Sequence, residues 1–500
     1  MKRLILFFLS ISIYFVSYSQ DASDALRLSK SMNYGSARFV SMGGAFGALG
    51  ADFTSLSYNP AGLGVFRSSE FSFTPSIKSR IDDTKYLGSQ YSDSRTRFSF
   101  DNLGIITSFK PINEEEQGLV MLNFGIGYNR INDFYSETTA FGANDFNSIM
   151  DYYAGLAHFY NFQDLAVSND YDPFRSTNAP WDAILAYNTF LIDTATGSTN
   201  EYWPALLMGD GVNQDQSISS EGGIGEYVFS LAANISNKLY LGATIGVQDV
   251  YLNQTIYYSE SAFSGNGTLP NGERFESMNY NQNLVVEGTG VNLKVGAIYR
   301  PIPNLRVGIA AHTPTYFNLN EKYNATMRST FNVGNSTSKT PNNLYDYRIE
   351  TPYKLIGSLA YTFGGAGLLS VDYEYVDYST MRFGKGGDGY RFIDENQDIK
   401  NTFTSTYNLK VGGEFWLKHL ALRGGYALYG TPFKEGFDLS SSPLTALSGG
   451  FGLRLDNFTL DWAYQRLMFS DKYLPYAIAP ETIERDITQN RFLLTLGFKF

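Results

Sequence analysis

From residue 69 to the end of the chain, apolar residues recur at every second position in segment after segment, which is the period of a β-strand. Phe124 and Ile126, for example, fall on one side of such a segment, and Asn123 and Asn129 fall on the other. Fourteen segments carry this pattern, near residues 69–80, 97–110, 118–130, 222–235, 238–253, 281–300, 303–316, 349–363, 367–378, 402–416, 419–430, 445–455, 457–468 and 490–500. The chain is therefore expected to be all-β.

The connections between these segments alternate in length. Short turns such as Ser236-Asn237-Lys238 and Asp456-Asn457 alternate with long polar connections. Short turns at one end, long loops at the other and an even number of strands are typical of an outer-membrane barrel. A soluble barrel would turn its apolar face inward, and a soluble sandwich would not need long loops at one end only. We predict a fourteen-stranded antiparallel transmembrane β-barrel, a monomer surrounded by outer-membrane lipid in a Gram-negative bacterium.

The last strand continues the alternation to the final aromatic residue, Phe500. An ordinary edge strand with this pattern would expose unpaired backbone groups, whereas a closed barrel pairs all of them. A terminal phenylalanine on the last strand resembles the assembly signal of outer-membrane barrels. The barrel assembly machinery is therefore an expected partner.

The N-terminus reads as a signal peptide over residues 1–20. Lys2 and Arg3 precede an apolar run that is too short to span a bilayer, and small residues follow it. The chain has no cysteine, which excludes a disulfide framework, a thiolate metal site and a cysteine nucleophile. Its net charge of −11 argues against nucleic acid as a partner. Removing the two basic residues would leave −13, from 36 basic and 49 acidic residues.

Residues 21–68 precede the strands and contain a glycine-rich stretch that fits neither a strand nor a helix. Glycine permits positive φ and close backbone packing, and the step from Asn59 to Pro60 favours a turn. The spacing of Gly44, Gly47 and Gly50 is not that of a dinucleotide-binding loop. We expect this segment to be a compact hatch inside the barrel formed by residues 69–500.

The largest insertion covers about residues 131–221 and lies on the side of the long loops. Residues 147–157 and 181–187 within it have an amphipathic, helical pattern. An aromatic, partly apolar loop of this kind could bind a hydrophobic ligand or pack over the mouth of the barrel, and one loop could do both.

The hatch sequence resembles that of the FadL/TodX family of outer-membrane channels for hydrophobic compounds, and most closely the branch found in Bacteroidetes-type bacteria. The likeness rests on Ser41-Met42-Gly43-Gly44-Ala45, Gly50-Ala51-Asp52 and Tyr58-Asn59-Pro60-Ala61-Gly62. It implies an N-terminal hatch in a fourteen-stranded barrel, with Asn59, Pro60 and Ala61 as a hatch motif. It also implies binding of long-chain fatty acids or aromatic hydrocarbons and their release through a lateral opening at a kink in the third strand.

Gly125 and Gly127 are the residues expected at that kink, because glycine within a strand marks a bend. The alternative, which is equally compatible with the sequence, is that both glycines face a crowded lumen.

Two groups of side chains are candidates for ligand binding. An apolar pocket is expected from Phe46, Leu49 and Phe53 of the hatch. A fatty-acid carboxylate would require a cation, and the inward positions offer Lys294, Arg306, Lys410, Arg423 and Arg454. The alternative for each cation is solvation in the lumen or pairing with a carboxylate such as Glu414 or Asp461.

Metal, haem and enzymatic chemistry have weaker support. Asp394, Asn396 and Asp398 have the spacing of a calcium loop but lack its glycine and its final glutamate, so the alternative is a solvated acidic loop. His158 in the large insertion could be an axial haem ligand, although nothing near it specifies haem. No cofactor is expected, a structural calcium in this acidic loop being the weaker alternative, and no motif indicates an enzyme.

We therefore predict passive uptake of hydrophobic small molecules. The loops would capture the molecule, a pocket in the hatch would bind it, and it would leave through a lateral opening in the barrel wall. Two other functions stay open at this point: a barrel whose loops bind surface ligands or mediate adhesion, and a haem-binding receptor.

Overall fold

The computed structural model describes residues 20–111, 117–206, 209–437, 439 and 441–500. The predicted signal peptide, apart from Gln20, lies outside these residues.

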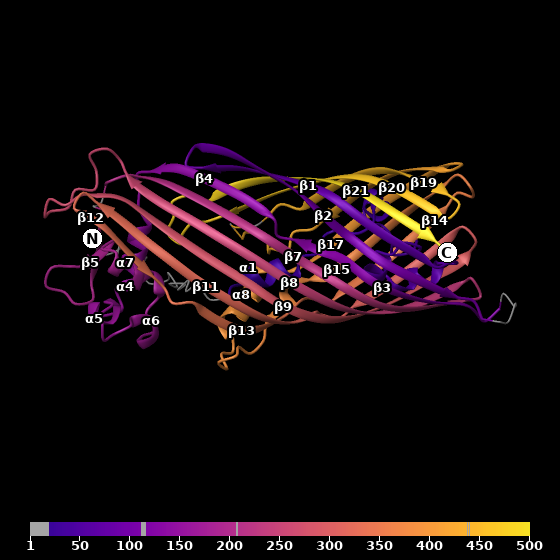
Figure 1. Ribbon diagram of the computed structural model, residues 1–500, viewed down its shortest axis with the longest axis horizontal. Coiled ribbons are helices and arrows are strands. Elements are labelled where there is room, and N and C mark those ends of the chain that lie inside the picture. Colours follow the sequence, from indigo (N-terminus) through magenta and orange to yellow (C-terminus); the bar gives the residue numbers. More distant parts are fainter. Residues whose placement is uncertain (1–19, 112–116, 207–208, 438, 440) are drawn as a thin grey trace, which may run out of the picture.

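Fourteen antiparallel strands form a closed ring, which confirms the predicted barrel (Figure 1). Each strand pairs with the next, and the last pairs with the first through Phe71↔Phe498 and the positions that follow. In ring order the strands are β1 (Glu70–Tyr86), β2 (Ser89–Phe109), β3 (Leu119–Asp133), β7 (Val212–Ile235), β8 (Leu239–Ala262), β9 (Phe275–Ile302), β10 (Leu305–His312), β14 (Lys354–Thr362), β15 (Gly367–Asp377), β17 (Ser405–Leu417), β18 (Leu420–Tyr429), β19 (Leu444–Leu455), β20 (Phe458–Tyr473) and β21 (Ile483–Lys499).

The apolar face of the strands points outward. On β3, Phe124 and Ile126 are 44% and 49% exposed, whereas Asn123 and Asn129 on the opposite face are buried. This is the arrangement that a lipid-facing belt requires, because water on the outside would leave these side chains unburied. Among the described residues, no helix is long and apolar enough to cross a membrane.

The strands are longer at the long-loop end than the sequence predicted. The connection expected between residues 80 and 97 is a tight turn at Leu87 and Gly88, and further rim strands occupy much of the other predicted loops. These are β4 (Ser136–Asn144), β11 (Tyr316–Phe331), β12 (Gly334–Lys339), β13 (Asn343–Glu350) and β16 (Arg382–Phe383). Beyond the membrane both faces of a strand contact water or protein, so the alternation that reveals a strand in the sequence disappears there.

The large insertion is shorter than predicted, because β3, β4 and β7 take up both ends of residues 131–221. Its remainder forms a helical subdomain beside the long-loop end of the barrel (Figure 1). The two expected helices are present, as α4 (Ile149–Ala157) and α7 (Trp181–Asn188). Two short helices, α5 (Phe162–Leu165) and α6 (Pro173–Ser176), and the hairpin of β5 (Ile192–Thr194) and β6 (Tyr202–Pro204) complete it.

The helical subdomain is fixed to the rim by apolar packing and by two buried carboxylates. Glu260 on β8 accepts hydrogen bonds from Ser148 Oγ and from the Ile149 N–H at the start of α4. Asp182 on α7 accepts a hydrogen bond of 2.5 Å from Tyr280 Oη on β9. Burial raises the pKa of Asp182 to about 6, because the charged form loses its hydration.

This pKa predicts that the helical subdomain is held more firmly at low pH. A carboxyl group with a raised folded-state pKa contributes stability that is fully present below pH ~4 and is lost as the pH rises through about 6. We expect this single group to weaken α7 docking by about 2–3 kcal/mol between pH 4 and pH 7. Hydrogen exchange of the α7 amides in the wild type and in Asp182→Asn measures it. An equal pH dependence in both proteins would contradict the prediction.

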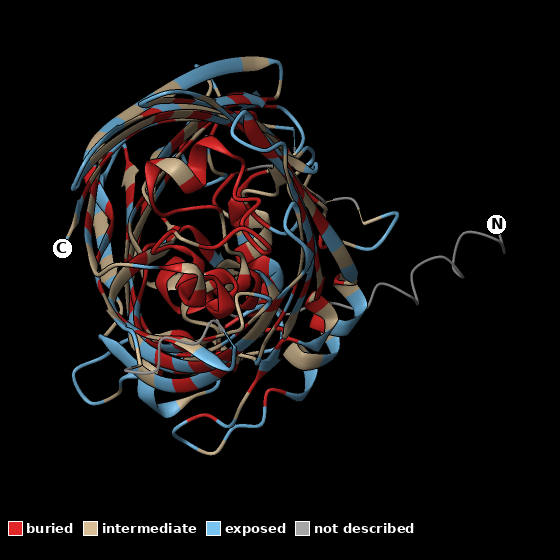
Figure 2. Cartoon of the chain, turned by 90° about the vertical axis from the view of Figure 1, so that its right-hand side faces the viewer, coloured by how far each residue is buried: buried red, intermediate tan, exposed pale blue. Residues whose placement is uncertain are grey.

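Residues 20–67, here called the luminal segment, lie inside the ring (Figure 2). The segment contains α1 (Ala22–Ser29), α2 (Ala37–Ser41), α3 (Ser55–Tyr58) and the 3-10 helix η1 (Pro60–Val65). Its backbone N–H groups donate to wall side chains, from Ala37 to Thr495 Oγ1 at 2.7 Å and from Gly47 to Asp372 Oδ2 at 2.8 Å. The connection between β15 and β17 adds α8 (Ile393–Thr402), which packs against α1.

Candidate functional site

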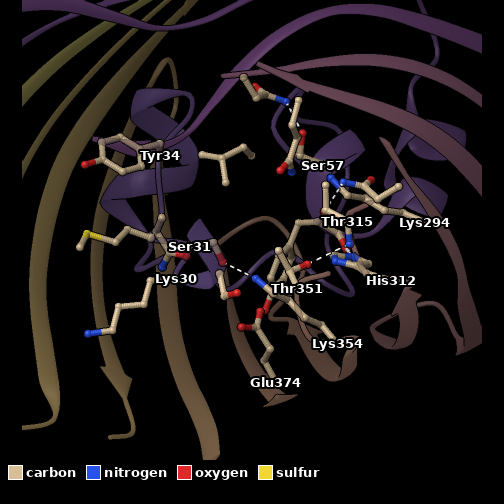
Figure 3. Close-up of a pocket in the computed structure, with 18 of the residues that line it drawn as sticks. Lys30, Ser31, Tyr34, Ser57, Lys294, His312, Thr315, Thr351, Lys354 and Glu374 are labelled. Atoms are coloured by element: carbon tan, nitrogen blue, oxygen red, sulfur yellow. Dashed lines mark hydrogen bonds between the residues drawn. The ribbon is translucent and has the colours of Figure 1, made fainter. Parts of the chain in front are cut away.

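A cavity of about 90 Å³ lies between the luminal segment and the inner wall of the barrel (Figure 3). Residues 28–34, from the end of α1 onward, form one side, and α3 forms another. The wall contributes residues of β3, β8, β9, β10, β14, β15 and β17. The volume accommodates a small polar group with a few waters but not a long alkyl chain.

Basic side chains outnumber acidic ones in the cavity lining. Lys30, Arg130, Lys294, Lys354 and Lys410 face the cavity, whereas Glu374 is its one acidic lining residue in the described part of the chain. His312 also lines it and shares a hydrogen bond of 2.7 Å between Nε2 and the Tyr58 carbonyl oxygen. A cavity of this composition favours an anion. Burial removes water from each ammonium group, and an anionic partner compensates for that loss.

Three of the five basic groups already have carboxylate partners. Lys294 Nζ binds Glu226, Lys410 Nζ lies 3.3 Å from Glu374 Oε2, and Arg130 Nε lies 3.5 Å from Asp101 Oδ1.

The two basic residues without a carboxylate partner are Lys354 and Lys30. Lys354 Nζ donates to Ser31 Oγ, a neutral acceptor in the luminal segment. Neither Lys354 nor Lys30 forms an ion pair with any described residue, and burial lowers the pKa of Lys30. The cavity therefore has two lysines without a carboxylate partner among the described residues, and a bound anion would favour their charged forms.

Apolar side chains complete the lining. Leu28 and Met32 come from the N-terminal part of the luminal segment, Phe39 from α2 and Ile131 from β3. The cavity thus combines cations with apolar surface, which suits one end of an amphiphilic molecule.

The Asn59-Pro60-Ala61 motif builds the luminal segment and does not line the cavity. The Asn59 side chain is buried, donates to the Gly47 carbonyl at 2.5 Å and accepts the Ala61 N–H at 3.1 Å. Pro60 begins η1, where its missing N–H costs nothing. The motif packs directly on the wall, because a methyl group added at Gly242 would lie 2.3 Å from the Pro60 carbonyl oxygen.

The structure places the three predicted pocket residues in packed interfaces and not in the cavity. Phe46 and Leu49 belong to the apolar core between the luminal segment and the wall, and Phe46 contacts Phe39 at a ring distance of 5.3 Å. Phe53 packs against Gly104 and Gly127 on the wall.

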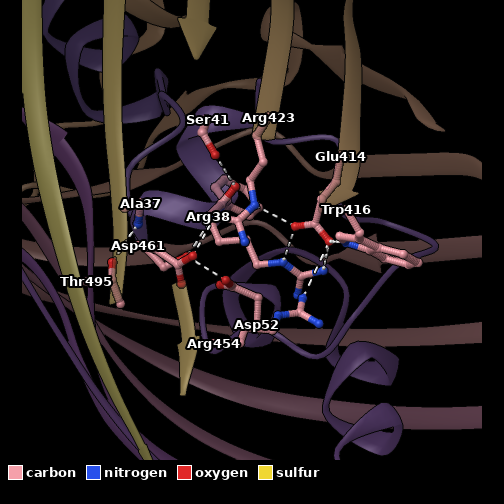
Figure 4. Close-up of polar contacts among 12 residues, drawn as sticks. Ala37, Arg38, Ser41, Asp52, Glu414, Trp416, Arg423, Arg454, Asp461 and Thr495 are labelled. Carbon is pink, nitrogen blue, oxygen red and sulfur yellow. Dashed lines mark hydrogen bonds and ion pairs between the residues drawn. The ribbon is translucent and has the colours of Figure 1, made fainter. Parts of the chain in front are cut away.

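Of the five predicted carboxylate-binding cations, only Lys294 and Lys410 line the cavity. Arg306 donates to the Leu49 carbonyl at 2.6 Å. Arg423 binds Glu414 and Asp461, each at 2.5 Å, as the alternative interpretation held, and Arg454 lies 3.5 Å from Glu414 (Figure 4).

Glu414 also accepts a hydrogen bond of 3.1 Å from Arg38 Nε on α2 (Figure 4). This cluster therefore fastens the luminal segment to the wall.

The predicted kink at Gly125 and Gly127 is wrong. Both glycines pair without interruption, Gly125 with Ile106 and Ser230, and Gly127 with Gly104 and Val228. They leave room for the luminal segment, because a methyl group would lie 2.5 Å from Leu56 at Gly125 and 2.5 Å from Phe53 at Gly127. The alternative interpretation, a crowded lumen, describes them correctly.

The calcium loop predicted at Asp394, Asn396 and Asp398 is also wrong, because these residues belong to helix α8. Asn396 is engaged with β16, accepting the Phe383 N–H at 2.8 Å. Among the described residues, no group of three or more His, Cys, Asp or Glu side chains is arranged to hold a metal ion. His158 is the C-cap of α4, lies on the exposed surface and does not line the cavity.

The sequence did not single out Lys30, Lys354 or His312 as cavity residues. The sequence did not reveal Lys354 because it lies two residues after Pro352, at the junction of β13 and β14, where the alternation is interrupted. Lys30 is the C-cap of α1, and the sequence does not show which part of the barrel wall this helix packs against.

Several solved structures share this architecture. A FadL homologue of Pseudomonas aeruginosa has a TM-score of 0.54 and 13% identity over 94% of this chain and 99% of its own. The toluene transporter TodX of Pseudomonas putida has a TM-score of 0.52 and 13% identity over 94% and 99%. The toluene transporter TbuX of Ralstonia pickettii has a TM-score of 0.50 and 15% identity over 94% and 98%.

No family model and no curated protein sequence matches the chain. At these identities the structural likeness shows the fold alone, and the chain has the barrel fold of the FadL/TodX channels.

Proposed function

We propose that the protein is an outer-membrane channel through which hydrophobic small molecules enter passively. Two of its structural neighbours are named as toluene transporters, which supports a hydrophobic substrate. The observation that carries the proposal is a luminal cavity that touches both a hatch-like segment and the barrel wall. The long-loop end would collect the ligand, and the luminal segment would close the direct path through the lumen.

We further propose that the ligand is an amphiphile with an anionic head group, such as a fatty acid, and not a neutral aromatic hydrocarbon. Lys354 supports this choice, because its ammonium group donates to the neutral Ser31 Oγ, and a carboxylate would supply the charged partner that it lacks among the described residues. The small volume of the cavity supports it as well, since only a head group fits there.

Mass spectrometry of small molecules that co-purify with the detergent-solubilised protein tests the proposed function. An enriched fatty acid or other lipophile, relative to an unrelated barrel, is the expected result. Enriched haem would favour a haem receptor. Failure of the protein to move any lipophile into vesicles would contradict the channel and favour a barrel that binds ligands with its loops.

Lys354→Gln tests the anionic head group. We expect the affinity for dodecanoate to fall about 10- to 100-fold, because a buried charge-assisted contact is lost, while the affinity for toluene stays unchanged. Titration of both ligands, followed by tryptophan fluorescence, measures the two affinities. Lys238→Gln in the short turn between β7 and β8 is the matched control. Equal dodecanoate affinity in Lys354→Gln and the wild type would overturn the assignment.

A further inference from the structure

The helical subdomain carries a large share of the negative charge of the protein. Residues 145–211, between β4 and β7, contain nine acidic residues and one basic residue, Arg175, so they account for −8 of the net charge of −11. In the described part of this region, the one ion pair joins Arg175 to Asp172 at 3.5 Å. The exposed carboxylates without a cation partner among the described residues are Asp145, Asp170, Asp193 and Glu201. Such a surface attracts cations and repels anions.

The hairpin of β5 and β6 presents an aromatic and an acidic side chain on its outer face. Trp203 pairs with Asp193 in the register of the hairpin, so both side chains project from the same face, and Trp203 is 65% exposed. The inner face is fixed by Tyr202, which is buried and packs edge to face on Tyr187 of α7 at a ring distance of 6.0 Å. Tyr202 Oη also donates to the Tyr160 carbonyl at 3.0 Å. The hairpin therefore holds the Trp203 ring in a fixed position at the surface.

Phe190, two residues before β5, occupies a position at which folding favours glycine. Its φ is +59°, in the left-handed region, directly after the C-cap of α7. The Phe190 N–H donates to the Tyr187 carbonyl at 3.1 Å, and the Leu191 N–H donates to the Ala186 carbonyl at 3.0 Å. Helices that end with this pair of hydrogen bonds usually have glycine at the left-handed position, because a β-carbon is strained there. Phe190 is 63% exposed, so burial of its ring does not offset the strain, and a binding role explains the residue better than a structural one.

Contact with the lipid belt does not account for these exposed rings. Phe124 and Ile126, which belong to the belt, follow the short turn at the start of β3. Figure 1 places β5 and α7 at the opposite, long-loop end of the barrel. Exposed aromatic residues that lie in water and not in lipid are typical of surfaces that bind another protein.

We propose that the outer face of the β5–β6 hairpin, together with Phe190, is a docking surface for a partner protein that presents a basic segment. An arginine or lysine of the partner would lie over the Trp203 ring, and Asp193 would pair with its charge. Charge complementarity selects this partner, because an anionic lipid surface or a second copy of this acidic chain would be repelled. The inference is independent of the proposed channel function, since none of these residues lines the cavity.

Fluorescence anisotropy of a labelled hexa-arginine peptide, titrated with the full chain in phosphatidylcholine nanodiscs, tests the proposal. We expect saturable binding that weakens at least about tenfold in Trp203→Ala and about fivefold in Asp193→Asn. The matched controls are Phe146→Ala, which removes a ring that is 79% exposed before α4, and Asp170→Asn, which removes another exposed charge. Both should bind within about twofold of the wild type. Equal affinity in Trp203→Ala and the wild type would overturn the proposal, as would a wild type that binds hexa-glutamate as tightly.

Phe190→Gly separates a binding role from a structural one. Because glycine relieves the left-handed strain, we expect the α7 amides to exchange about fivefold more slowly while hexa-arginine binding weakens about tenfold. Faster exchange in α7 together with unchanged binding would assign Phe190 a structural role and overturn its place in the surface. Binding of anionic vesicles, or a dimer of the wild type, that is lost in Trp203→Ala would identify lipid or a second copy as the occupant and overturn the basic partner.

Discussion

Glu414→Gln is expected to loosen the luminal segment from the barrel wall while the barrel stays folded. Glu414 is buried and forms ion pairs with Arg38 of α2 and Arg423 of β18. It also accepts a hydrogen bond of 2.5 Å from the Trp416 indole N–H. Removing its charge leaves the guanidinium groups of Arg38, Arg423 and Arg454 facing a neutral amide, and breaking a buried pair in this way costs about 3–5 kcal/mol. Most of that cost falls on docking, because Arg38 is the only one of the three donors that can leave with the segment.

Tryptic cleavage after Arg38 measures this loosening. The Arg38 side chain is 16% exposed, so trypsin reaches the bond only after the segment opens. A cost of about 3 kcal/mol corresponds to cleavage about 100 times faster when opening precedes cleavage. The control is Glu484→Gln, which removes an exposed pair with Lys85 at 3.9 Å and should change little. Equal cleavage rates in Glu414→Gln and the wild type would show that the cluster does not hold the segment.

The ring of strands could be predicted from the sequence because a strand between lipid and lumen must alternate. Phe124 and Asn123 occupy the faces that this rule assigns to them. Alternation does not reveal strands above the membrane, where β1 and β2 continue to a turn at Leu87 with polar residues on both faces. The strand count was therefore correct and the strand ends were not.

The candidate site could be predicted less well, because its pairings join residues far apart in the sequence. Nothing local indicates that Arg423 binds Asp461 or that Lys294 binds Glu226, and these pairings decide which cations stay available. A glycine in a strand is ambiguous in the same way. Gly127 could mark a bend or a close neighbour, and only the position of Phe53 distinguishes the two.

Gly425→Val is expected to displace the luminal segment by direct collision. Gly425 on β18 lies opposite Gly412 on β17, and the backbone at Met42 and Gly43 passes over both. A methyl group at Gly425 would lie 2.1 Å from the Gly43 nitrogen, and one at Gly412 would lie 2.3 Å from the Met42 carbonyl oxygen. These neighbours are backbone atoms that cannot rotate away, so relief requires the segment to move. Overpacking costs about 1–3 kcal/mol where side chains can adjust, and we expect at least that here.

The neighbouring residue provides the control. A methyl group at Gly424, which points outward, would have no atom within 4 Å, so Gly424→Val makes the same chemical change on the lipid face of the same strand. Valine also suits a strand better than glycine, so neither variant should weaken the barrel itself. We expect Gly425→Val to raise both the tryptic cleavage rate after Arg38 and the ion conductance of the barrel in planar bilayers. Gly424→Val should match the wild type in both. If the two variants behave alike, close backbone contact at β17 and β18 is not what seats the luminal segment, and the Glu414 cluster must hold it alone.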